Sequence, residues 1–295
     1  MARIEFPESP FRTEDLADWL ELTAIDAADR NASAGDMERE LKRLGHGDPY
    51  SLLGSVFIEV ERRETAAGKD AYPFDRKDSS IELKGDPKNY PAYVFCLALS
   101  YQKWTNRKSA AENPWLLFEE LAHYSAKNYL GGEALVFGTS NREGAKCAKR
   151  FQASVNDLAK KLGEGESFRA QRTFSAKDSK LDLVAWKGFP DCRPSQIILF
   201  GQCAGGGNWR GKLNELIPED FWDQWMNRSK VSTPLRSVFV PHRVFDDDEW
   251  EKHARNARLL FDRCRVAAFA HRDTAHGKFA DRLLKCCRTE WELKV

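Results

Sequence analysis

Two apolar runs close together in the chain decide its fold: KLDLVAW at residues 180–186 and IILFGQCA at residues 197–204. Each run has the length of one strand, and residues 188–195 between them carry the Gly and Pro of a turn. Because both runs are apolar on both faces, we predict neighbouring central strands at residues 181–186 and 197–203.

Helices and strands alternate on both sides of these runs. Asn113 and Pro114 begin one helix, because Asn caps a helix and Pro fits its first turn, and Gly131 ends it. Further helices are expected at residues 144–162, 209–225, 248–260 and 278–291, and further strands at 134–137, 237–240 and 265–269. Strands that alternate with helices predict an α/β fold around a mixed sheet.

The pattern of the first 108 residues is different and mainly helical. Helices are expected to begin at Thr13, near Met37 and after Asp48, with a short strand at residues 80–84 and a buried helix at 90–104. We therefore expect a helical N-terminal domain at residues 1–108 and an α/β domain at 109–295. The polar segment 105–109 is the expected linker between them.

The composition is that of an ordinary globular protein and does not indicate a partner. The 46 Lys and Arg residues nearly balance the 45 Asp and Glu residues, so a DNA contact would have to come from a local basic surface. The seven cysteines include no CxxC pair, which favours free thiols in a reducing compartment. Since we find no apolar leader and no membrane-spanning run, we expect a cytoplasmic protein without a membrane partner.

Asp182 and Gln202 are the polar side chains that these two runs carry. A carboxylate inside an apolar strand is costly unless a cation or several donors stabilise it. Gln202 comes 20 positions later, near the end of the second run, so neighbouring strands can place both side chains at one end of the sheet. Their oxygens suit Mg²⁺ or Mn²⁺ if they lie about 4–6 Å apart, and the adjacent Cys203 is a further candidate metal ligand.

These motifs resemble those of the PD-(D/E)xK, or restriction-endonuclease-like, nuclease superfamily over residues 113–215. In that family a strand Asp and a following strand with Glu or Gln and Lys hold Mg²⁺ for phosphodiester hydrolysis, and the preceding helix often adds a Glu. Asp182 matches the Asp, Gln202 the Glu or Gln, and Glu119 the helix acid. The resemblance implies a restriction-endonuclease-like mixed sheet flanked by helices. It also implies a metal-dependent DNA endonuclease in restriction, repair or anti-phage defence.

One position departs from the family pattern. The Lys should lie two positions after Gln202, where this chain has Ala204. Some members supply this Lys from the next helix, and Lys212 is placed to do so, with Arg210 as the weaker candidate. A cation there would orient the attacking water and stabilise charge on the scissile phosphate. Without that cation, the protein would be a catalytically inactive nuclease-fold adaptor that binds a partner protein in a multi-component system.

Each candidate residue also has an ordinary structural explanation. Asp182 could cap a turn, and Gln202 could be a buried amide that bonds the backbone. Glu119 could interact with the dipole of its helix, and Lys212 could be solvated. The joint order of helix acid, strand Asp, strand Gln and helix Lys is what favours a catalytic site.

Basic residues gather on or beside the helix expected at residues 144–162 and in the approach to Asp182. They are Arg142, Lys146, Lys149, Arg150, Lys160, Lys161, Arg169, Arg172, Lys177 and Lys180. A local basic surface would bind DNA despite the neutral net charge, whereas the interspersed acidic residues favour an ordinary solvated helix face. DNA is the expected partner. A protein partner at the N-terminal domain and an oligomer are both compatible with the sequence.

Overall fold

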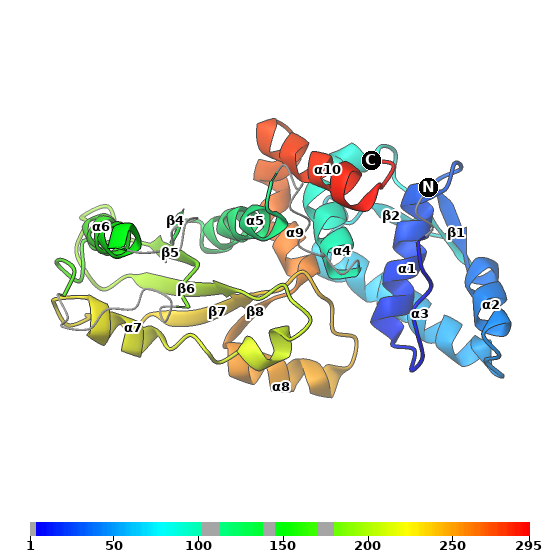
Figure 1. Cartoon of the computed structure of the whole chain (residues 1–295), viewed down its shortest axis with the longest axis horizontal. Helices are drawn as coiled ribbons and strands as arrows, with labels where there is room; N and C mark the ends of the chain where they lie inside the picture. Colours follow the sequence, from blue (N-terminus) through cyan, green and yellow to red (C-terminus); the bar gives the residue numbers. More distant parts are fainter. Residues whose placement is uncertain (1–3, 102–111, 138–144, 170–179) are drawn as a thin grey trace. The chain divides into compact units, whose positions relative to one another are not determined.

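The computed structural model describes residues 4–101, 112–137, 145–169 and 180–295, and of residues 145–150 the backbone alone. Contacts within the chain divide it into two compact units (Figure 1). The first unit consists of Met1–Leu117, Pro241–Trp250 and Asp262–Val295, and the second of Phe118–Val240 and Glu251–Phe261.

A mixed five-stranded sheet forms the centre of the second unit, with the strand order β4-β5-β6-β7-β8. The strands are β4 (Glu133–Val136), β5 (Leu183–Lys187), β6 (Ile197–Cys203), β7 (Leu235–Phe239) and β8 (Leu259–Phe261). The β4–β5 and β5–β6 pairs are antiparallel, whereas the β6–β7 and β7–β8 pairs are parallel. The prediction that the two apolar runs form neighbouring central strands is therefore confirmed.

The register of the two central strands explains why position 201 is a glycine. Leu183 of β5 lies opposite Gly201 of β6. The Cδ1 atom of Leu183 is only 2.7 Å from the position that a Cβ atom at Gly201 would occupy. A side chain at Gly201 would force the Leu183 side chain to shift, so the glycine permits the close approach of β5 and β6.

Helices flank this sheet (Figure 1). They are α5 (Pro114–Leu130), α6 (Ala145–Leu162), the 3₁₀ turn η3 (Trp209–Lys212), α7 (Pro218–Trp225) and α8 (Asp247–Ala257). Phe200 of β6 packs against Phe221 and Trp222 of α7, with ring centroids 5.3 and 6.1 Å apart, and Phe151 of α6 packs on Trp225. The buried aromatic side chains thus join α6, α7 and the centre of the sheet in one core.

Two expected elements differ in the structure. The helix expected at residues 209–225 is interrupted after η3, because Pro218 starts a new helix and the preceding Ile217 is extended. The strand expected at residues 265–269 was wrong, since this segment lies in α9 (Arg263–Thr274), where the Asp262 side chain accepts a hydrogen bond from the Arg265 N–H and caps the helix. The last strand is instead β8.

The first unit is mainly helical, as expected for its N-terminal part. Its helices are α1 (Thr13–Asp26), α2 (Ala34–Arg43), α3 (Pro49–Ala67), η1 (Pro87–Asn89), α4 (Pro91–Tyr101), α9 and α10 (Lys278–Trp291). A small antiparallel sheet, of order β1-β3-β2, consists of β1 (Asn31–Ser33), β2 (Phe74–Arg76) and β3 (Ser80–Leu83). Of these strands, only β3 was expected from the sequence.

The first unit contains residues from both of the expected domains, 1–108 and 109–295. Residues 262–295 belong to this unit because α9 and α10 pack on α4, and α9 also contacts α3. The burial of Val266, Ala270, Leu283 and Leu284 supports this packing. The expected linker at residues 105–109 lies outside the described residues. Among the described helices, none has the length and hydropathy needed to cross a membrane.

Candidate functional site

Asp182 lies one residue before β5 and is fixed between β4 and β6. Its backbone N–H donates to the Gly201 carbonyl at 2.9 Å, and its own carbonyl accepts from the Phe137 N–H at 2.6 Å. Its carboxylate oxygen Oδ2 accepts from the Cys203 N–H at 2.8 Å. Because β5 begins where the antiparallel β6 ends, these bonds hold the Asp182 carboxylate at the end of the sheet that also carries Gln202.

Gln202 is nearly fully buried in β6. Its Nε2 atom donates to Glu215 Oε2 at 3.3 Å, while its acceptor Oε1 is buried without a hydrogen-bond partner among the described residues. Buried acceptors without a partner are rare, because the lost hydration costs about 1–3 kcal/mol. A cation or donor placed beside the Gln202 Oε1 atom would therefore satisfy this acceptor.

Glu215 and Lys180 complete this group and were not predicted as site residues. The Lys180 Nζ atom lies 3.9 Å from Glu215 Oε2, and the side chains are 46% and 35% exposed, so both are accessible to solvent. Lys180 adopts the left-handed backbone region at φ 50°. We call Lys180, Asp182, Gln202 and Glu215 the sheet-end cluster.

Only a partial signal for these two residues is present in the sequence. Lys180 belongs to the basic surface predicted from the sequence, because its separation from Asp182 by one residue does not show where its side chain lies. Glu215 lies in a segment expected to be helical, and the helical pattern does not indicate that its side chain is near Gln202. The turn between η3 and α7 places it beside Gln202.

Lys212, the expected catalytic cation, ends η3 instead of lying one turn inside an α-helix. Its side chain makes no hydrogen bond or ion pair with the described residues. The Arg210 guanidinium stacks on the Trp209 ring at 4.6 Å from the ring centroid. Among these three cations, Lys180 is the one whose described contacts include another residue of the sheet-end cluster, Glu215.

The other expected site residues have different positions. Successive side chains of a strand point to opposite faces, so the Cys203 thiol is expected on the face opposite the Gln202 amide, and its role as a metal ligand stays a prediction. Ala204 is buried, and its N–H donates to the Phe239 carbonyl at 2.9 Å. Glu119 lies half-buried in α5, and its role in the site stays a prediction.

The metal-ligating capacity of the sheet-end cluster rests on two carboxylates and one amide. In the part of the chain that the structure describes, no group of three or more His, Cys, Asp or Glu side chains is arranged to hold a metal ion. Asp182, Glu215 and the Gln202 Oε1 atom are all oxygen donors, which are the ligands that Mg²⁺ and Mn²⁺ prefer. The unsatisfied Gln202 acceptor fits such an ion.

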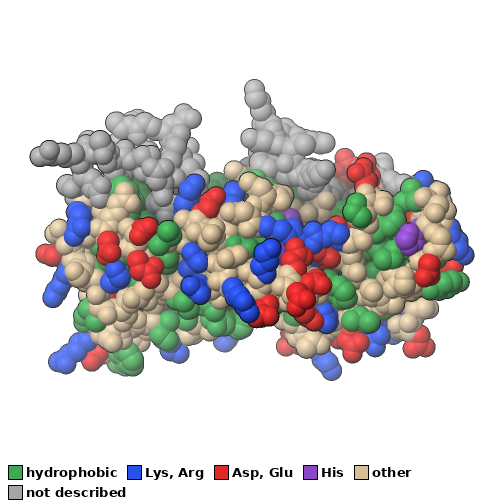
Figure 2. All heavy atoms as spheres, turned by 90° about the horizontal axis from the view of Figure 1, so that it is seen from below, with side chains coloured by type: hydrophobic (Ala, Val, Ile, Leu, Met, Phe, Trp, Pro, Cys, Tyr) green, Lys and Arg blue, Asp and Glu red, His purple; other side chains and the backbone are tan. Residues whose placement is uncertain are grey.

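The expected basic surface is described only in part. Lys161 forms an ion pair with Asp157 at 2.8 Å, and Arg169 donates to the Asp223 carbonyl at 2.7 Å. Beyond the described side chains lie Arg142, Lys146, Lys149, Arg150, Arg172 and Lys177. On the face drawn in Figure 2, Lys and Arg side chains lie among Asp and Glu side chains, and neither sign covers a wide area alone.

A second group of charges is buried in the first unit and was not predicted. Its members, which we call the buried ion-pair network, are Asp18, Glu21, Glu59, Arg63, Arg243, Asp262 and Arg263. Arg63 lies 2.7 Å from Asp18, 3.0 Å from Glu21 and 2.7 Å from Glu59. Arg243 joins Glu59 to Asp262, and Arg263 holds both oxygens of Asp18.

Burial and the arginines oppose each other in the pKa values of this network. At Asp18 burial acts to raise the pKa, but Arg263 and Arg63 lower it below its ordinary value. At Glu21 burial prevails over Arg63, and the pKa is raised. The Tyr72 and Tyr93 hydroxyls donate to the Glu21 carboxylate at 2.9 and 3.0 Å. Since these side chains are inaccessible to a substrate, the network is part of the core.

Comparison with known proteins gives no match: no family model, curated protein or solved structure is similar to this chain. Among the described residues of the second unit, the sheet-end cluster combines strand ends, an unsatisfied acceptor and accessible charges. It can offer oxygen ligands to a cation and, through Lys180, a positive charge to an anionic substrate.

Proposed function

We propose that the second unit is a metal-dependent nuclease with a restriction-endonuclease-like sheet that hydrolyses phosphodiester bonds in DNA. One observation carries the proposal: Asp182 and Gln202 lie at the shared end of β5 and β6, and the buried Gln202 Oε1 atom has no partner among the described residues. In the resembled superfamily a strand Asp and a Glu or Gln of the following strand hold the metal, and this likeness supports the proposal. A role in restriction or anti-phage defence is part of the same proposal.

Each residue of the sheet-end cluster has a distinct task in this proposal. Asp182, the Gln202 Oε1 atom and Glu215 would hold Mg²⁺ or Mn²⁺, which when bound supplies Lewis-acid stabilisation and lowers the pKa of a coordinated water. The Cys203 N–H fixes the Asp182 carboxylate. Lys180 would stabilise negative charge on the scissile phosphate. Lys212 remains the alternative cation and Glu119 an additional acid.

Cleavage of supercoiled plasmid DNA in Mg²⁺ or Mn²⁺ tests this function. Wild-type chain should nick or linearise the plasmid, EDTA should stop the reaction, and Asp182→Ala should lower the rate by about 100-fold or more. Asp157→Ala, which removes an exposed carboxylate on α6, is the matched control and should cleave like the wild type. Equal cleavage by Asp182→Ala and the control would reject the sheet-end cluster as the catalytic site.

A catalytically inactive adaptor is the second candidate function. It is favoured by the buried Ala204 at the position of the family Lys. It is also favoured by the Asp182 carboxylate, which already accepts from a backbone N–H. An adaptor would leave plasmid DNA intact with either metal, and Asp182→Ala would change neither its DNA binding nor its partner binding.

A further inference from the structure

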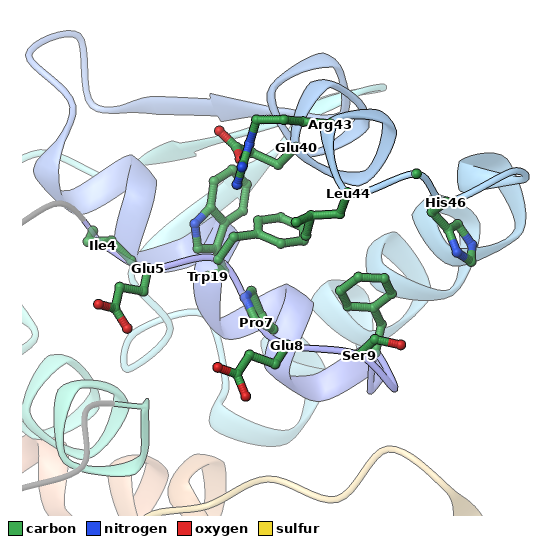
Figure 3. A pocket seen from close by; sticks show the side chains of 13 residues that line it. Ile4, Glu5, Pro7, Glu8, Ser9, Trp19, Glu40, Arg43, Leu44 and His46 are labelled. Carbon is green, nitrogen blue, oxygen red and sulfur yellow. The ribbon is translucent and has the colours of Figure 1, made fainter.

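A large cavity lies in the first unit, between residues 4–11, α1 and the end of α2 (Figure 3). Its volume is about 1000 Å³, at the upper end of the range typical of ligand sites in proteins. A smaller cavity of about 290 Å³ shares Ile4, Trp19 and Glu40 with it. We call the two cavities together the N-terminal groove.

The floor of the N-terminal groove is aromatic. Phe6 contacts the Trp19 ring edge-to-face at 4.8 Å and the Phe11 ring at 5.9 Å, and Phe11 contacts His46 at 5.7 Å. Leu44, at the end of α2, is 47% exposed and adds aliphatic surface. Aromatic faces attract ammonium and guanidinium groups, and the aliphatic surface suits the stems of Lys and Arg.

Carboxylates lie at the edge of the cavity, on the N-terminal segment and on α2. Glu5 and Glu8 are exposed on the N-terminal segment, and neither side chain forms an ion pair with a described residue (Figure 3). Glu40 pairs with Arg43 at 2.8 Å, so the lining of the larger cavity carries an excess of two carboxylates when His46 is neutral. The smaller cavity adds Asp26 and Asp36, which are joined to Lys294 and Arg39.

We propose that the N-terminal groove binds a segment of a partner protein that presents lysine or arginine side chains. Charge complementarity carries the proposal, because Glu5 and Glu8 offer negative charge to a cation whose stem packs on the aromatic floor. The same carboxylates repel nucleic-acid phosphates, so the groove is not a DNA contact. This inference is independent of the nuclease proposed for the second unit.

Binding of the full chain to an array of random octapeptides tests the proposal. The bound peptides should be enriched in Lys and Arg, and the enrichment should fall with rising NaCl. Glu5→Gln/Glu8→Gln should remove most of it and weaken the best peptide, measured by fluorescence anisotropy, by roughly 5-fold or more. Leu44→Ala, at a largely exposed position, should weaken the same peptide without unfolding the chain.

Asp70→Asn/Asp78→Asn is the matched control, since it also removes two exposed carboxylates of the first unit. It should leave peptide binding unchanged. Absence of enrichment, or equal weakening by the two double variants, would overturn the proposal. Tetramethylammonium that competes at the concentration of the peptide would overturn the protein partner in favour of a small organic cation. Self-association of the chain that Glu5→Gln/Glu8→Gln abolishes would overturn it in favour of a second copy.

Discussion

The two groups of polar side chains in this molecule differ in how far their charges are paired and shielded from solvent. Each group keeps a buried oxygen without a hydrogen bond among the described residues, Glu59 Oε2 in the network and Gln202 Oε1 in the cluster. In the buried ion-pair network, each of the seven charged residues has an ion-pair partner inside the network, and Arg63 and Arg263 are fully buried. In the sheet-end cluster, Gln202 keeps an acceptor without a partner among the described residues, and Lys180 and Glu215 are partly exposed.

This difference distinguishes structural charges from those that bind a ligand. Charges that are paired and shielded from water can stabilise one arrangement of α1, α3 and α9, but they offer nothing to a ligand. The charges of Lys180 and Glu215 are accessible to solvent, so they can meet a ligand. We therefore expect substitutions in the network to change folding and substitutions in the cluster to change function.

The largest effect should follow from breaking the network at Arg263. Arg263→Met removes the guanidinium that holds both oxygens of Asp18 and donates to the Ser100 hydroxyl at 2.9 Å. Because Asp18 then remains buried with only Arg63 as its ion partner, the free energy of unfolding should fall by about 3–5 kcal/mol. Urea unfolding followed by circular dichroism measures the change.

Arg255→Met is the matched control for this substitution. The Arg255 and Glu251 side chains form an ion pair but are 76% and 63% exposed. The loss should therefore stay below about 0.5 kcal/mol. Equal losses for Arg263→Met and Arg255→Met would show that the network contributes no more than a surface pair.

A smaller effect, on rate and not on stability, should follow from removing Lys180. Lys180→Ala should lower the rate of metal-dependent plasmid cleavage by roughly 10- to 100-fold, because Lys180 is the cation that reaches the sheet-end cluster. Its unfolding free energy should change little, since the side chain is 46% exposed. Lys212→Ala should cleave nearly as fast as the wild type. The reverse order of rates would restore Lys212 as the catalytic cation.

The smallest effect concerns Asp15, at the margin of the network. Burial, with Asp18 and Glu14 nearby, raises its pKa to about 6. A raised pKa means that folding disfavours the charged form, so this group lowers stability progressively as the pH rises from about 4 to about 6. Asp15→Asn should therefore stabilise the chain at pH 7 by up to about 1 kcal/mol after solvent screening, and hardly at pH 4.

Thermal unfolding at the two pH values measures this difference. The exposed Asp78→Asn serves as the control and should be neutral at both pH values. Stabilisation of the Asp15 variant that is the same at pH 4 and pH 7 would contradict a cause in ionisation.

The central sheet could be predicted from the sequence, because the residues that specify its two central strands and the turn between them are close together in the chain. An apolar run of strand length has few alternatives, and the turn at residues 188–195 makes β5 and β6 neighbours. For the same reason Asp182 and Gln202 could be expected at one end of the sheet. The bond from the Cys203 N–H to the Asp182 carboxylate agrees with this expectation.

The remaining contacts could not be predicted, because they join residues far apart in sequence. Asp18 and Arg263 are separated by 245 positions, and neither helix pattern shows which charge enters the core. For Arg63 the sequence weakly indicates burial, since this residue lies on the same side of α3 as Val56 and Val60. At the site, the chain leaves the helical path between η3 and α7. Glu215 therefore lies beside Gln202, and Lys212 ends a 3₁₀ turn instead of lying within an α-helix.

Binding of Mn²⁺ tests most directly whether the sheet-end cluster is a ligand site, because it needs no knowledge of the DNA target. Electron paramagnetic resonance of the free ion counts bound Mn²⁺ in a titration to about 1 mM. We predict one ion per wild-type chain, its loss in Asp182→Asn, tighter binding in Gln202→Glu and unchanged binding in Asp157→Asn. A wild-type chain that binds no ion in this range, or an Asp182→Asn variant that binds like the wild type, would contradict the account.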